Sequence, residues 1–189
     1  MTLIFDPLNH RYYVDGLPVP GLHEILKAVG LIWEDWFLPE KTLRGRYVHK
    51  AIDLLNKGVL DWNTVKNPIL GYVRAYQKAQ DELKFQVLSS ELFLYAPKYG
   101  FCCTIDWLVE FDGVLCLLEG KSGQFQKIHA LQVGAQKLAL AENGHHISKK
   151  HVLKLNENGT YRLEPIDFRA EFDWLTVLSF YNLKLNYRG

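Results

Sequence analysis

The chain has 189 residues, of which 48% are hydrophobic and 23% charged, and its formal net charge is +1. This length suits a single domain, so we predict one domain over residues 1–189. The composition excludes the low hydrophobicity and high charge of a disordered chain. No apolar run reaches the roughly 20 residues that cross a bilayer, so we expect no membrane partner.

The first half of the chain is predicted to be mostly helical. Short strands are expected within residues 3–14, around the turn formed by Asp6-Pro7-Leu8-Asn9. Apolar residues at helical spacing then predict helices over 22–29, 39–56 and 69–83, the last started by Asn67-Pro68.

The second half switches to strand patterns. Residues 86–95, 101–111 and 114–121 are rich in β-formers, and Asp112-Gly113 between the last two segments is a strong hairpin signal. A helix over 128–141, a hairpin of 151–155 with 160–165, and a final helix over 168–185 are expected to follow. The sum predicts an α/β fold bordering on α+β, with a mixed central sheet flanked by helices.

The three cysteines, Cys102, Cys103 and Cys116, lie inside apolar runs without CxxC spacing. They are predicted to be reduced core residues in a cytosolic protein, and not a disulfide framework or a metal site.

Two carboxylates are predicted to face each other in the central hairpin. The two-residue turn at Asp112-Gly113 sets a register in which Asp106 lies opposite Glu119, with Lys121 on the same face. Carboxylates ~5.5 Å apart repel by about 3 kcal/mol at an effective dielectric constant of ~20. A cation between them would relieve this repulsion, and hard oxygen ligands favour Mg²⁺ or Mn²⁺.

A third carboxylate, that of Glu91, lies beside these two under one condition. If the loop before residue 101 consists of residues 97–100, Glu91 faces Asp106, whereas a loop one residue shorter or longer turns Glu91 to the other side. A structural alternative stays open, in which Lys121 neutralises one carboxylate in a salt-bridge ladder. In that case the acidic row serves stability only.

These residues resemble the PD-(D/E)xK nuclease superfamily, and most closely its RecB-like branch, which includes small phage exonucleases. The core motif reads Thr104–Asp106 followed by Glu119–Lys121, and the early-helix histidine of the branch is matched within Gly45–His49. The glutamine of the following helix is matched by Gln132, while Gln136 stands where the branch has a tyrosine. The resemblance implies a restriction-endonuclease-like core.

The resemblance also implies roles for individual residues. The implied metal ligands are Asp106, Glu119, the Gly120 carbonyl, His49 and Glu91. The implied catalytic residues are Asp106, Glu119, Lys121 and Gln132. Nucleic-acid contacts are expected at Arg44, Arg46, Lys50 and Gln136, with a second basic run at Lys149–His151. Some relatives hold an iron–sulfur cluster with four cysteines, so three cysteines predict no such cluster.

We therefore expect a Mg²⁺- or Mn²⁺-dependent DNA nuclease, of phage exonuclease type, that acts on single strands or duplex ends. Its expected location is the cytoplasm of a bacterial or phage-infected cell. One alternative is a nucleic-acid-binding module with a nuclease-like fold that does not hydrolyse its ligand. The other is an unrelated α+β protein. The cleavage polarity and the oligomeric state stay open.

Overall fold

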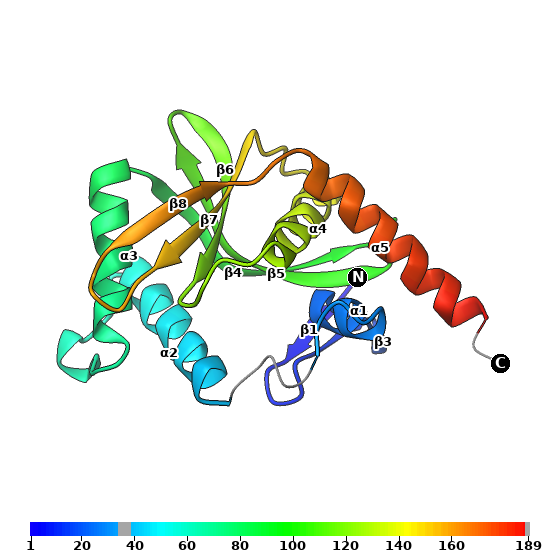
Figure 1. Cartoon of the computed structure of the whole chain (residues 1–189), viewed down its shortest axis with the longest axis horizontal. Helices are drawn as coiled ribbons and strands as arrows, with labels where there is room; N and C mark the ends of the chain where they lie inside the picture. Colours follow the sequence, from blue (N-terminus) through cyan, green and yellow to red (C-terminus); the bar gives the residue numbers. More distant parts are fainter. Residues whose placement is uncertain (34–38, 188–189) are drawn as a thin grey trace.

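The structure is a computed structural model in which residues 1–33 and 39–187 are described. A five-stranded sheet forms its centre, with strand order β4-β5-β6-β7-β8 (Figure 1). The strands are β4 (Gln86–Ala96), β5 (Phe101–Phe111), β6 (Val114–Lys121), β7 (Lys149–Leu155) and β8 (Tyr161–Pro165). All neighbours are antiparallel except β6 and β7, because helix α4 (Ile128–Glu142) crosses over between them.

Helices cover both faces of this sheet, as the sequence predicted. Helices α2 (Pro39–Asn56) and α3 (Leu70–Leu83), with the short 3-10 helix η2 (Trp62–Thr64) between them, enclose one hydrophobic core. Helices α4 and α5 (Arg169–Asn186), together with α1 (Leu22–Ala28), enclose the other. The predicted mixed sheet flanked by helices is therefore confirmed.

A small second sheet precedes the central one. It has the strand order β1-β2-β3, formed by β1 (Leu3–Asp6), β2 (Arg11–Val14) and β3 (Leu17–Val19). The Phe5 ring stacks on Phe93 of β4 at 4.9 Å, and the Tyr12 hydroxyl lies 2.8 Å from Thr104 Oγ1 on β5. These contacts fix the N-terminal sheet against the strands that carry the candidate site.

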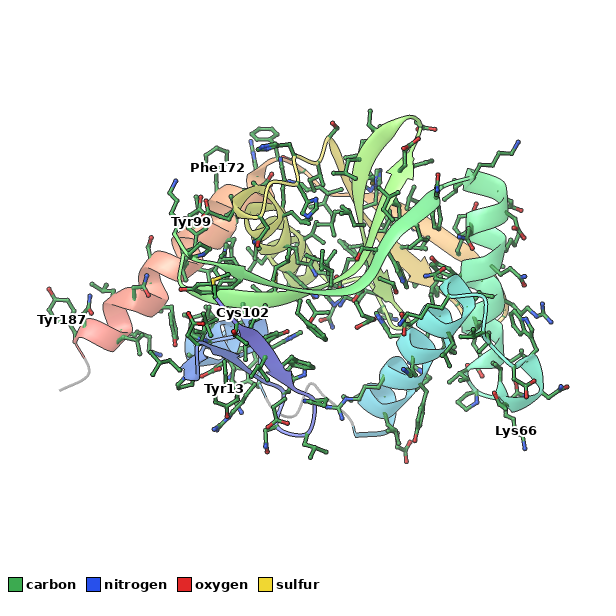
Figure 2. The ribbon with its side chains drawn as sticks, turned by 180° about the vertical axis from the view of Figure 1, so that it is seen from behind. Tyr13, Lys66, Tyr99, Cys102, Phe172 and Tyr187 are labelled. Carbon is green, nitrogen blue, oxygen red and sulfur yellow. The ribbon has the colours of Figure 1, made fainter. Side chains whose placement is uncertain are left out.

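The strand and helix ends follow the predicted ones closely. Helix α2 and strands β5 and β6 have the predicted bounds, and the other predicted helices and central-sheet strands differ by one or two residues at their ends, whereas β3 and η2 were not predicted. The three cysteines are buried and free, with Cys102 on β5 inside the fold, whereas Phe172 of α5 and Tyr187 just after α5 point outward (Figure 2). Within the described part of the chain, no helix is both long and apolar enough to cross a membrane.

Candidate active site

Strand β5 changes face at Asp106. Ile105 packs into the core beneath α4, whereas Trp107 packs into the core beneath α2 and α3. Residues two apart in a regular strand share one face, so the strand turns over at this point. The pairing of β5 with β6 ends at Trp107 and Leu118, and Asp106 Oδ2 accepts a hydrogen bond of 2.7 Å from the Gly120 N–H.

Because β5 changes face at Asp106, the predicted pairing of Asp106 with Glu119 is wrong. Every observed pair between β5 and β6 follows the predicted register, but the ladder stops one pair before these two carboxylates. The Asp106 side chain meets α2, and the Glu119 side chain meets α4 on the other face of the sheet. The two groups still interact, because the charge of Asp106 helps to raise the pKa of Glu119.

Three potential metal ligands converge at the point where β5 changes face. His49 of α2, Glu91 of β4 and Asp106 of β5 each offer one ligand atom, and these atoms lie within 4.8 Å of one another. His49 Nδ1 is 3.4 Å from both Glu91 Oε1 and Asp106 Oδ1. These separations exceed the usual hydrogen-bond distance of roughly 2.7–3.2 Å. We call these three residues the ligand cluster.

Glu91 reaches the ligand cluster through an unusual backbone conformation. Its φ is +52°, in the left-handed region that non-glycine residues rarely adopt. On both sides of Glu91, strands β4 and β5 pair in the register that a four-residue loop predicts. Glu91 itself is not paired with Asp106. Its Oε1 atom is buried without a hydrogen bond among the described residues. Such local strain is characteristic of functional sites.

Gly120 makes room for the histidine of the ligand cluster. The His49 ring stacks on Trp107 with ring centroids 5.8 Å apart. A Cβ atom on residue 120 would lie 2.4 Å from the Trp107 ring and 3.3 Å from His49 Cε1. Only glycine therefore fits beside these two rings in this packing, and the middle residue of the Glu119–Lys121 motif has a steric role.

Glu119 lies in a separate hydrogen-bond network with α4. Its Oε1 atom accepts from Lys121 Nζ and from Gln132 Nε2, both at 2.6 Å, and its Oε2 atom accepts from Gln136 Nε2 at 2.6 Å. Lys121 Nζ also donates to Gln132 Oε1 at 3.0 Å. We call these four residues the Glu119 network. The ion pair of Lys121 with Glu119 is also the contact that the structural alternative predicted.

Burial corrects the expected nucleic-acid contact of Gln136. Gln136 has no exposed surface, and its Nε2 also donates to the Thr104 carbonyl at 2.9 Å. It is therefore enclosed and cannot contact a nucleic acid in this structure. Gln132 is 9% exposed and connects the lysine with the carboxylate.

The charged groups of the site shift one another's pKa values. Burial opposes the charged form of His49, but the Asp106 and Glu91 carboxylates outweigh it and hold the pKa of His49 well above its ordinary value. Burial, and then the nearby Asp106, raise the pKa of Glu119 to about 7. Burial acts against Lys121 as well, but Glu119 and Asp106 keep its pKa raised. Despite burial, His49 and Lys121 keep the pKa of Asp106 lowered.

The basic residues of α2 divide into two groups. Arg44 is half-buried, donates to the Ser122 carbonyl at 3.0 Å and lies over the Tyr72 ring, so it supports the segment after Lys121. Arg46 and Lys50 are exposed, and Lys50 is 3.9 Å from Asp53. Of the predicted contacts on this helix, Arg46 and Lys50 are therefore accessible to a ligand.

The second predicted basic run is not a surface patch. Lys150 is 7% exposed and forms an ion pair with Glu171 of α5. Lys149 is 2.8 Å from Asp112, and the His151 ring contacts Phe111. These side chains alternate between the two faces of β7, so they cannot form one phosphate-binding surface.

Several features of the site have no signal in the amino-acid sequence. Neither the left-handed φ of Glu91 nor the bend at Asp106 follows from residue type. The Arg44 contact with Ser122 joins residues 78 apart, which local patterns do not reveal. Gln136 is four residues after Gln132 on the same helix face, and that spacing was a usable signal for a shared partner.

Comparisons with known proteins found structural likeness only. No protein-family model matches the chain, and no curated protein matches its sequence. The chain is similar to an alkaline exonuclease, LHK-Exo, from Laribacter hongkongensis, at 14% identity over 86% of each chain, with a TM-score of 0.47. It is also similar to LHK-Exo in complex with dAMP, at 14% identity over 89% of this chain and 88% of that one, with a TM-score of 0.44.

Proposed function

We propose that this protein is a metal-dependent nuclease that hydrolyses phosphodiester bonds in DNA, a RecB-like member of the PD-(D/E)xK superfamily and an exonuclease of phage type. The observation that supports this most is the ligand cluster itself, in which three distant segments bring His49, Glu91 and Asp106 together. A half-buried lysine, Lys121, lies within electrostatic reach of Asp106. Such an enzyme would work in the cytoplasm of a bacterial or phage-infected cell.

The ligand cluster fits a divalent cation. Two carboxylates and one imidazole supply hard oxygen donors and a nitrogen. Among the described residues, no donor gives Glu91 Oε1 the hydrogen bond that a buried oxygen normally has. His49, Glu91 and Asp106 would hold the ion, with the Gly120 carbonyl as a further ligand that the family resemblance implies, whereas both oxygens of Glu119, the other implied ligand, are engaged by the residues of α4 and by Lys121. Because Mg²⁺ prefers oxygen ligands throughout, the imidazole favours Mn²⁺ of the two candidate ions.

When bound, the ion would lower the pKa of a coordinated water and offset charge on the scissile phosphate. The chain's own contribution centres on Lys121. Its ammonium group is held charged by Glu119 and Asp106, and it would stabilise the negative charge that develops on the phosphate oxygens. No covalent intermediate is needed for this chemistry.

The Glu119 network would position the lysine. Gln132 accepts from Lys121 and donates to Glu119, so it fixes the distance between the two groups. Gln136 holds the second carboxylate oxygen and anchors it to β5 through the Thr104 carbonyl. Buried networks in which each donor finds an acceptor restrict side-chain motion, and catalysis depends on such restriction.

A direct cleavage assay tests the proposal. Labelled single-stranded and double-stranded DNA is incubated with the protein in Mg²⁺, Mn²⁺ or EDTA. Products that depend on the metal are expected, and terminal mononucleotides would identify an exonuclease. Retarded DNA without products would instead support the non-catalytic binding module. Neither binding nor cleavage would support the unrelated α+β protein, in which the acidic residues are structural.

A further inference from the structure

Three cationic side chains lie in register across neighbouring strands beside the candidate site. Lys121 of β6 is the parallel partner of Lys154 on β7, and Lys154 is the antiparallel partner of Arg162 on β8. Partners in register project from the same face, and neighbouring strands are about 4.8 Å apart. The Cα atoms of the three residues therefore span about 10 Å. We call this set the cationic row.

The sheet face is open at the outer part of the cationic row. On the same face of β7, Lys150 and Val152 are buried by α4 and α5. Beyond them Lys154 is only half-buried, and the Arg162 side chain is 73% exposed. The opposite face of this hairpin is closed, because Leu153 and Leu155 belong to the core beneath α3. The hairpin lies next to α3 and away from most of α4 (Figure 1).

The cationic row keeps an excess of positive charge. Lys121 is paired with Glu119, and Glu164 Oε1 is 2.5 Å from Arg162 Nε. Lys154, between them, has no ion-pair partner within the described part of the chain. Like charges on neighbouring strands are unfavourable by themselves. The arrangement is therefore suited to an anion that bridges several positions.

We propose that the cationic row binds the sugar–phosphate backbone of a polynucleotide strand that continues from the scissile phosphate across β7 and β8. This inference rests on the proposed function, because it takes Lys121 as the point where the phosphate reacts. Lysine offers a flexible point charge, and arginine offers a planar group for phosphate oxygens. The contact of Glu164 with Nε leaves the terminal amino groups of Arg162 for another acceptor. The strand thus follows the open face of the sheet.

Binding at different salt concentrations tests the cationic row. The double variant Lys154→Ala/Arg162→Ala is compared with the wild type by fluorescence anisotropy, using a labelled oligothymidylate in EDTA so that the probe stays intact. The matched control is Lys78→Ala/Lys98→Ala, which removes two exposed charges from α3 and from the β4–β5 turn. Thermal melting shows that each variant is folded. The affected positions are accessible, so little change in melting temperature is expected.

Loss of two phosphate contacts has a defined signature. The slope of log affinity against log salt is expected to be smaller by about 1.4, and the affinity to fall roughly tenfold near physiological salt. The control pair is expected to keep the slope and affinity of the wild type. An unchanged slope and affinity in Lys154→Ala/Arg162→Ala would overturn the inference. So would an equal loss in the control pair, because it would indicate net charge alone.

The same preparations separate this inference from the proposed function. If the wild type cleaves DNA while the double variant binds DNA like the wild type, the proposal for the cationic row is wrong and the nuclease proposal stands. If the wild type binds DNA through the row but yields no products with either metal, the row stands and the nuclease proposal fails.

Discussion

Two groups of charged side chains, each around one buried carboxylate, lie at opposite ends of the parallel pair β6–β7, and they are built differently. At the start of β7, Glu171 forms an ion pair with Lys150 through one carboxylate oxygen and with Lys137 through the other. At the end of β6, the ligand cluster leaves His49 Nδ1 at 3.4 Å from two carboxylates, and Glu91 Oε1 lacks a hydrogen bond among the described residues. Both carboxylate oxygens of Glu171 therefore have partners, whereas Glu91 Oε1 in the ligand cluster does not have a hydrogen-bond donor among the described residues.

This difference distinguishes a structural ion pair from a site that fits an added cation. Asp106 and Glu171 are both buried, so the burial and charge of a carboxylate alone do not separate the two groups. The ligand cluster also includes the left-handed φ of Glu91, whereas neither Glu171 nor its two lysines has a positive φ. Unsatisfied polar atoms and backbone strain together mark functional positions, because neither is favourable for stability.

The largest expected effect is the loss of cleavage in Asp106→Asn and Lys121→Ala. Each substitution removes a charge that acts on the ion or on the phosphate, so cleavage is expected to fall by roughly 100-fold or more. The melting temperature should stay within a few degrees of that of the wild type. Rates like the wild type in either variant would mean that these residues do not form the active site.

The next largest effect should concern stability at the other charge group. Glu171→Gln leaves Lys137 and Lys150 without their shared carboxylate, and breaking a buried pair of this kind costs about 3 kcal/mol. A chemical unfolding curve measures this loss in free energy, and the cleavage rate at a temperature where the variant is folded should be unchanged. A stable variant that has lost activity would reverse the assignment of the two groups.

A smaller effect is expected in the pH dependence of the metal-free protein. Glu119 has its pKa raised from 4.5 to about 7, so the folded state binds more protons than the unfolded state, and stability falls as pH rises through this window. His49, with its pKa raised above 6.5, contributes stability that is lost at higher pH still. Burial lowers the pKa of His23 to about 4 and that of His129 to about 3, so these two histidines add stability as pH rises toward 6.5. The Glu119 contribution is therefore measured as the difference in melting temperature between the wild type and a variant.

The variant Glu119→Gln isolates the first of these two contributions. Relative to the wild type, this variant should lack the fall in stability that Glu119 contributes between pH 4.5 and 7, because glutamine does not titrate, while the loss above pH 6.5 that His49 contributes remains. The lowered pKa of Asp106 acts in the opposite direction, but only at acid pH below its ordinary value of 3.8. The same pH dependence in the variant and in the wild type would show that Glu119 does not titrate as described.

The sequence predicted the scaffold better than the site, for physical reasons. The Asp112-Gly113 turn fixed the register of β5 with β6, because two-residue turns impose one pairing. Strict alternation then placed Asp106 on the face of Glu119, and this failed because β5 turns over at Asp106. A bend of this kind depends on packing against both layers of helices, which local residue patterns do not encode.

Burial of polar residues was the second limit. Lysines and glutamines are usually exposed, so Lys150 and Gln136 were expected at the surface. In the structure each is enclosed because a carboxylate from a distant segment meets it, Glu171 for the lysine and Glu119 for the glutamine. The position of Lys150 two residues before the buried Val152 was a usable signal, since both share one face of β7.

Calorimetric titration with Mn²⁺ tests the central claim most directly, because it asks whether the ligand cluster holds a cation, independently of any substrate. The wild type and Glu171→Gln should bind Mn²⁺ alike, whereas Glu91→Gln should bind at least roughly tenfold more weakly, since it loses an anionic ligand. No binding by the folded wild type, or equal binding by Glu91→Gln, would contradict the account.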